Sequence, residues 1–151
     1  MISGTWIERF PFPVVSAAIR VEGITVDWVL VPFVVDTGAT HTSIHARDAI
    51  RLLRIPPEAL DPTSWPVSAI STGVGGTASY LIRPAEFMFA HDDATDGVEL
   101  IQSDVQLGAL DDPTASLPSL LGWDVLQHFD VRLRGRLSVS LERLSSRPTS
   151  P

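Results

Sequence analysis

Short runs of β-branched and other apolar residues, separated by turn signals, dominate the chain. Residues 14–21 and 24–30 flank the dipeptide Glu22-Gly23, which is typical of a turn, so the two runs predict a hairpin. This hairpin leads into residues 31–35, where apolar side chains do not alternate with polar ones. Such a run indicates a strand that is buried on both faces. The first part of the chain therefore predicts β-sheet.

Two stretches change to a helical period. Residues 43–55 carry apolar side chains near helical spacing with polar residues between them, and Pro56-Pro57 ends the run. Residues 120–129 show a shorter pattern of the same kind. We therefore expect one or two short α-helices within a chain whose other elements are strands.

The remaining segments predict strands and connections. Residues 56–66 hold four prolines and predict a surface connection. We expect a hairpin with strands at 67–70 and at 80–82 followed by 86–90, around a glycine-rich tip. We also expect a strand at 98–107, a loop at 110–118 and a terminal hairpin at 130–141. The expected fold is all-β, with a single domain at 1–144 and a disordered tail at 145–151.

Composition excludes several kinds of chemistry. A net charge of −7 without a basic cluster argues against a nucleic-acid partner. All eleven basic residues are arginine, so no lysine nucleophile is present, and the lack of cysteine excludes disulfides and thiolate catalysis. No apolar run reaches the roughly 18 residues of a membrane span, and the first residues do not resemble a signal peptide. A cytoplasmic protein without a membrane partner is expected.

An acidic residue ends the buried run, in the sequence Asp36-Thr37-Gly38-Ala39-Thr40. Burial disfavours a carboxylate anion, so such a group persists when it is hydrogen-bonded, paired or functional. Gly38 permits a sharp turn, and threonine hydroxyls can bond to neighbouring backbone groups. On this motif alone, the favoured interpretation is that Asp36 caps a helix or fixes a turn.

Two further motifs favour a functional role for Asp36 over that of a cap or turn residue. Gly73-Val74-Gly75-Gly76 lies at the expected hairpin tip, where three glycines suit either a mobile lid or a plain flexible turn. It is not a phosphate loop, because no GK[ST] sequence or helical pattern follows it. Leu120-Leu121-Gly122 precedes the second helical stretch, and by itself this motif predicts core packing.

Taken together and in this order, the three motifs resemble the retropepsin-like aspartic proteases, and more closely their cellular and bacterial branch. The resemblance covers nearly the whole domain, from about residue 14 to residue 141. It implies a closed or partly open β-barrel with a flap hairpin, and an aspartic endopeptidase that acts on peptides or proteins. It implies no metal and no organic cofactor.

The resemblance also implies a role for each motif. Asp36 would be the catalytic acid, Thr37 would hydrogen-bond across to the partner's loop, and Gly38 would offer its backbone to substrate. The other implied positions are Ala39 and Thr40 in the active-site loop, Gly73, Val74, Gly75 and Gly76 in the flap, and Leu120, Leu121 and Gly122 as support beneath the loop.

The motif occurs once, although this chemistry needs two carboxylates that share one proton. Asp104, Asp124 and the pair Asp111-Asp112 lack the Thr-Gly context. A domain of this length does not hold two lobes. The expected enzyme is therefore a homodimer in which Asp36 of each copy meets on the two-fold axis.

The chain departs from the retroviral members at two positions. Those members commonly carry an Asp and an Arg that pair within one subunit, whereas this chain has Thr40 and Trp123 there. How the dimer is held together is also open, and the strand at residues 137–141 is our candidate interface element.

Two other functions stay open. The fold could serve as a catalytically inactive module that dimerises or binds an extended peptide by strand addition. A metal-dependent hydrolase could use His41 and His45, which would share a helical face with Asp48 nearby. For these histidines the favoured interpretation is ordinary surface residues, and His41 could also line a substrate subsite.

Overall fold

The computed structural model describes the chain except residues 8–9, 66–67, 74–75, 94–96, 112–114 and 145–151. The described part is mostly β-strand with two short α-helices, which confirms the all-β prediction. The helical elements are α1 (Ala46–Arg51), α2 (Trp123–Leu126) and the 3-10 turns η1 (Pro57–Leu60) and η2 (Pro62–Ser64). The predicted tail at 145–151 and the flap residues Val74 and Gly75 lie outside the described residues.

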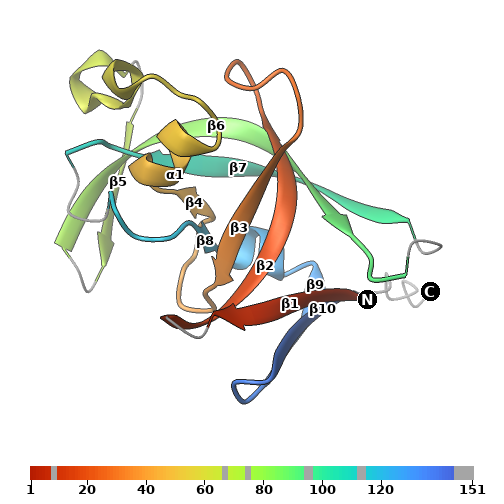
Figure 1. The fold of residues 1–151 in the computed structure, drawn as a ribbon. Helices are drawn as coiled ribbons and strands as arrows, with labels where there is room; N and C mark the ends of the chain where they lie inside the picture. Colours follow the sequence, from red (N-terminus) through yellow and green to blue (C-terminus); the bar gives the residue numbers. More distant parts are fainter. Residues whose placement is uncertain (8–9, 66–67, 74–75, 94–96, 112–114, 145–151) are drawn as a thin grey trace, which may run out of the picture.

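All the strands belong to a single sheet (Figure 1). In sheet order they run β5-β6-β7-β4-β8-β3-β2-β1-β10-β9, and β6 also pairs with β2, so the sheet folds back on itself. The strands are β1 (Ile2–Ile7), β2 (Phe10–Val21), β3 (Val29–Val35), β4 (Ser43–Ile44), β5 (Ser68–Gly73), β6 (Gly76–Ala90), β7 (Val98–Gly108), β8 (Leu120–Leu121), β9 (Phe129–Arg134) and β10 (Ser138–Arg143).

Side chains that point inward from these strands form the core. Phe33 and Phe87 are fully buried, and their ring centroids lie 6.1 Å apart. Phe89 contacts Phe129 edge-on, with ring centroids 5.4 Å apart, so the β6 side of the core reaches β9. The helix α1 lies with η1 and η2 at one end of the sheet, in the upper left of Figure 1, and buries Ala49 there.

The N-terminal strands differ from the expected ones in three ways. Residues 24–30 are not one strand, because the chain turns after β2, where the Ile24 and Thr25 amides donate to the Val21 carbonyl, and β3 begins only at Val29. β1 was not expected at all. β2 begins at Phe10 in spite of two prolines, since the pairing with β1 shifts register there, and such irregular pairing tolerates residues without an N–H group.

The two helical stretches are shorter than expected, because each begins as a strand. Ser43 and Ile44 form β4, so α1 starts at Ala46, and Leu120 and Leu121 form β8 ahead of α2. No helix within the described ranges is long and apolar enough to cross a membrane.

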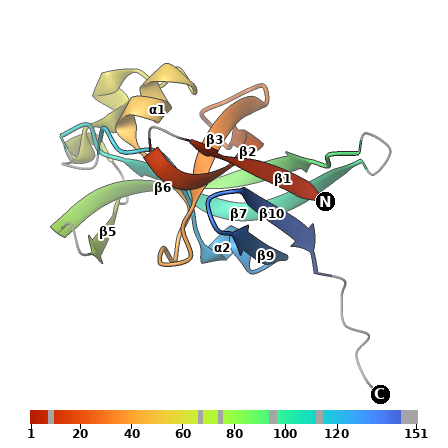
Figure 2. The ribbon, with the colours of Figure 1, turned by 60° about the horizontal axis from the view of Figure 1, so that its bottom comes forward.

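The terminal hairpin is confirmed, and the interface role of the strand at residues 137–141 stays a prediction. β10 pairs with β9 on one edge and with β1 on the other (Figure 2). Its Val139 and Leu141 side chains are buried. Both edges of residues 139–141 are therefore occupied within the chain, so these residues cannot pair with a strand of a second copy.

Candidate active site

The loop that carries Asp36 has both of its ends fixed by β8. β8 lies between β3, which precedes the loop, and β4, which follows it (Figure 1). The Asp36 amide donates to the Leu121 carbonyl at 3.1 Å, and Ser43 pairs with Leu120 on the other edge of β8. The two-residue strand β8 thus pairs both with the strand before the loop, β3, and with the strand after it, β4.

The Asp36 carboxylate is half-buried and is oriented by its own loop. The Gly38 amide donates to Asp36 Oδ1 at 2.8 Å, and the Ala39 amide donates to the Asp36 carbonyl at 3.2 Å. These bonds close a tight turn of the kind that aspartate often makes. Asp36 Oδ2 accepts no hydrogen bond from any residue that the structure describes. One carboxylate oxygen is therefore held by the turn, and the other is open to a ligand.

Gly122 lies where β8 and the loop come closest. A Cβ atom at this position would lie 2.5 Å from the carbonyl carbon and 2.6 Å from the carbonyl oxygen of His41. Both atoms are backbone and cannot rotate away. Glycine is therefore required here for the loop to pack directly on the segment after β8.

The first turn of α2 binds the loop backbone. The Trp123 amide donates to the Ala39 carbonyl at 2.9 Å, and the Asp124 amide donates to the Thr40 carbonyl at 3.1 Å. The first N–H groups of a helix have no partner inside it, so these donors were available to the loop. The structure thus brings the Leu120-Leu121-Gly122 segment and the acid-bearing loop together.

A buried polar pair fixes the far end of the loop. Thr42 is fully buried, and its hydroxyl donates to Asp124 Oδ1 at 2.7 Å while it accepts from the Gly122 amide at 3.0 Å. The Thr42 amide also donates to Asp124 Oδ2 at 2.8 Å. Sequence reasoning missed this pair, because Asp124 was considered only as a second catalytic acid. An acidic residue in the first turn of a short helix was the available signal.

Trp123 supplies a contact where the retroviral ion pair is absent. Its indole Nε1 donates to the Thr37 carbonyl at 2.7 Å, and its side chain is 45% exposed. A neutral hydrogen bond therefore ties α2 to the residue that follows the acid. The Thr37 side chain is exposed on the loop, and its bond to a partner chain stays a prediction.

The expected flap hairpin is formed as far as the structure describes it. β5 and β6 pair from Ser68 opposite Leu81 to Gly73 opposite Gly76. This confirms the hairpin and places the glycine-rich motif at its end. The flap role of the motif stays a prediction.

The two histidines do not share a helical face. His41 lies in the exposed loop, whereas His45 is buried immediately before α1, with its Nδ1 2.8 Å from the Pro118 carbonyl oxygen. The expectation that both are surface residues is therefore also wrong for His45. Asp48 accepts from the Ser119 hydroxyl at 2.9 Å. No group of three His, Asp or Glu side chains in the described ranges is arranged to hold a metal ion.

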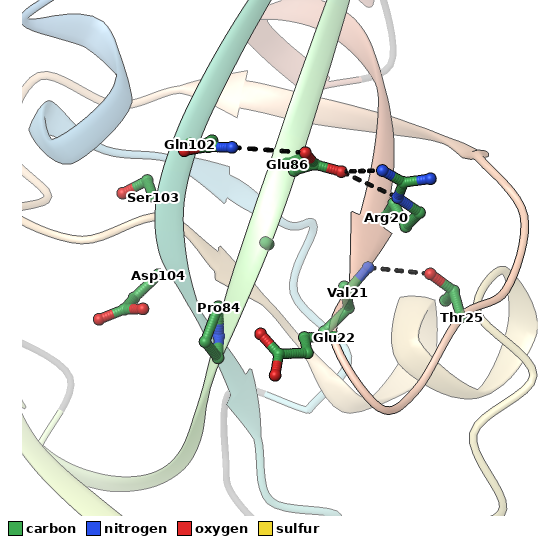
Figure 3. A pocket seen from close by; sticks show the side chains of 10 residues that line it. Arg20, Val21, Glu22, Thr25, Pro84, Glu86, Gln102, Ser103 and Asp104 are labelled. Carbon is green, nitrogen blue, oxygen red and sulfur yellow. Dashed lines mark hydrogen bonds and ion pairs between the residues drawn. The ribbon is translucent and has the colours of Figure 1, made fainter.

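A hollow of about 630 Å³ opens on the outer face of β2, β6 and β7 (Figure 3). Arg20 and Glu86 form an ion pair across it, Gln102 contacts Glu86, and Asp104 lies at its other side. None of the residues predicted for catalysis lines this hollow. It is therefore separate from the Asp36 loop.

Neither a protein-family model nor a curated protein sequence matches this chain. The interpretation of the Asp36 loop consequently depends on its geometry and on the motif resemblance.

Proposed function

We propose that the chain is an aspartic endopeptidase that works as a homodimer, with one Asp36 from each copy. The observation that carries the proposal is the support of the Asp36 loop. Amides of α2 bind its carbonyls, Gly122 packs against its backbone, and one carboxylate oxygen of Asp36 is left unbonded among the described residues. An aspartate that only caps a helix or fixes a turn does not need these contacts from α2 and Gly122.

Two such carboxylates supply complementary roles in peptide hydrolysis. One, ionised, accepts a proton from water as the water oxygen attacks the scissile carbonyl carbon. The other, protonated, donates a hydrogen bond to the carbonyl oxygen and stabilises the charge that develops there. Protonation of the amide nitrogen then lets the C–N bond break. Two carboxylates held close together cannot both ionise, so they share one proton as this cycle requires.

The sheet is compatible with the retropepsin-like barrel that we propose for this fold. The pairings β6–β7, β7–β4, β4–β8, β8–β3, β3–β2 and β2–β6 form a closed circuit. In this proposal the β5–β6 hairpin serves as the flap that covers a bound peptide. The Asp36 loop lies within the circuit at β3, β8 and β4.

The direct test is cleavage of a peptide library by Asp36→Asn, with Asp104→Asn as the matched control. Both substitutions remove one carboxylate, but Asp104 is exposed on β7 and lies outside the loop. We expect Asp36→Asn to abolish cleavage while the fold and the dimer stay intact, and Asp104→Asn to cleave normally. Full cleavage by Asp36→Asn would refute the proposal.

A non-catalytic module that binds an extended peptide is the second candidate. In the sheet order β5 and β9 are the end strands, so each has an outer edge without a partner in the described chain. Such an edge can accept a further strand. Under this function Asp36→Asn would leave peptide binding unchanged, and no wild-type cleavage would be seen at any pH.

A further inference from the structure

A half-open cavity of about 370 Å³ with a mixed apolar and polar lining lies at the end of the sheet that α1, η1 and η2 cover. Its volume is within the range of small-molecule binding sites. The apolar walls include the side chains of Leu53, Ile55, Leu60, Trp65, Leu81 and Leu107. Among the residues that the structure describes, Arg54 and Arg83 are the only charged ones that line it.

Arg83 occupies a position on the core-facing side of β6. Leu81 and Ala85, two residues before and after it, are both buried, and its cross-strand partner Val105 is buried as well. Arg83 itself is half-buried and lines the cavity. Within the described ranges Arg83 has no ion pair, and its guanidinium donates only to the carbonyl of the adjacent Ile82.

Arg54 is held in a backbone conformation that disfavours an arginine. Its φ angle of 61° is the only positive value at a non-glycine residue in the described chain. It follows the end of α1, where the Ile55 amide donates back to the Ala49 carbonyl, and glycine is the usual residue at such a position. Glycine at this position would make the turn more stable, so the stability of the turn does not explain why residue 54 is an arginine.

We propose that this cavity binds an amphipathic carboxylate, with its hydrocarbon chain against the apolar walls and its anionic head between Arg83 and Arg54. Guanidinium groups form strong, charge-assisted bonds with carboxylates. Both arginines lack an acidic partner in the described chain, and no acidic residue among those that the structure describes lines the cavity. Asp36 does not line the cavity either.

The test is a titration with sodium octanoate, monitored by two-dimensional NMR of the tryptophan indole N–H groups. Trp65 lines the cavity and donates from Nε1 to the Ala59 carbonyl, whereas Trp6, Trp28 and Trp123 lie outside the cavity and act as internal references. We expect a saturable shift of the Trp65 signal. Octan-1-ol, which has the same chain without the charge, should bind at least about tenfold more weakly. No saturable shift, or equal affinity for the alcohol, would overturn the proposal.

Three variants separate binding from stability. Arg83→Gln and Arg54→Gly should each weaken octanoate binding about tenfold, whereas Arg51→Gln, which removes a nearby exposed charge outside the cavity, should not change it. Arg54→Gly should also raise the melting temperature, because glycine tolerates the positive φ. Unchanged octanoate affinity in the Arg54→Gly/Arg83→Gln double variant would contradict the proposed site.

Discussion

At the residue scale, Gly122 packs against the backbone of His41 with no room for a side chain. We expect Gly122→Ala to lower the free energy of unfolding by about 1–3 kcal/mol, because the added Cβ overlaps backbone atoms that must move. Gly38→Ala is the contrast, since its Cβ would approach only the Asp36 carboxylate, at 3.2 Å. That variant should keep its stability and lose cleavage. Urea unfolding measures both, and equal stability of the two variants would contradict this packing.

Trp123 is the second residue that decides the local geometry. Trp123→Phe keeps an aromatic ring but removes the indole donor to the Thr37 carbonyl. One hydrogen bond contributes about 1 kcal/mol to stability, so we expect the free energy of unfolding to fall by about that amount, and kcat/KM to fall because the Asp36 loop loses a contact with α2. Trp28→Phe is the control, because Trp28 packs beside Arg20 instead of the loop. A cleavage rate equal to that of wild type would show that the hydrogen bond from Trp123 to the Thr37 carbonyl does not contribute to catalysis.

Individual residues were predictable from the sequence only where they belonged to a motif. Asp36 follows a buried run, and Gly38 donates to it as a turn residue should. The bond from Trp123 to Thr37 joins residues 86 positions apart, so no local pattern could reveal it. His45 was misjudged for the same reason, because its burial depends on a carbonyl 73 positions away.

At the element scale, the loop between β3 and β4 depends on the buried Thr42 hydroxyl. Thr42→Val keeps the shape of the side chain but leaves the Gly122 amide without its acceptor, whereas Asp124 Oδ1 still accepts from the amides of residue 42 and Val125. We expect a loss of about 1–3 kcal/mol in the free energy of unfolding, the cost of one buried polar group left unsatisfied. Thr40→Val, on the exposed part of the same loop, should change stability by less than about 0.5 kcal/mol. Similar losses in the two variants would contradict this role for Thr42.

The contact between β2 and β6 predicts a pH-dependent contribution to stability. The Arg20 guanidinium hydrogen-bonds to Glu86 and lowers the pKa of that carboxyl below its usual value of 4.5. A lowered folded-state pKa means that the contribution is present at higher pH and is lost as the pH falls through that pKa. Glu86→Gln should therefore lose more stability at about pH 7 than at about pH 3. Glu22→Gln, beside the same hollow but without an ion pair in the described chain, should show no such difference.

If urea unfolding showed that Glu86→Gln loses equal stability at both pH values, the predicted pH dependence would be contradicted. The effect would then come from packing or from neutral hydrogen bonding, and not from the ion pair.

Elements with their own periodicity were predictable, and elements defined by their partners were not. The hairpin of β9 and β10 has alternating side chains around Gly135, and it formed as expected. β4 and β8 contain two residues each, so no period exists to detect. They are strands only because β7, β3 and each other lie alongside, and this pairing shortened both expected helices.

At the scale of the whole molecule, one chain supplies only half of the proposed site. The order of motifs and the strand-rich pattern were enough to predict an all-β chain, because they depend on local sequence. The interface between copies was not predictable in the same way. The expected interface strand is enclosed between β1 and β9 of its own chain, so the proposed dimer would not form by sheet extension through β10.

Dimer formation should make activity depend on concentration. We expect specific activity to fall on dilution, because dissociation separates the two Asp36 carboxylates, and to be restored on concentration. The measurement is cleavage rate against protein concentration, alongside sedimentation velocity at each concentration. Constant specific activity across a range in which the protein becomes monomeric would contradict a shared site.

The most direct test of the shared site is a subunit-mixing measurement with wild type and Asp36→Asn. Equal amounts are mixed at constant total protein and allowed to exchange subunits, and the cleavage rate is compared with that of wild type alone. If both carboxylates are needed, only dimers of two wild-type copies are active, and the rate should fall to about one quarter by random pairing. A rate of about one half would mean that each chain acts independently, and it would contradict the account of Asp36 as half of an active site.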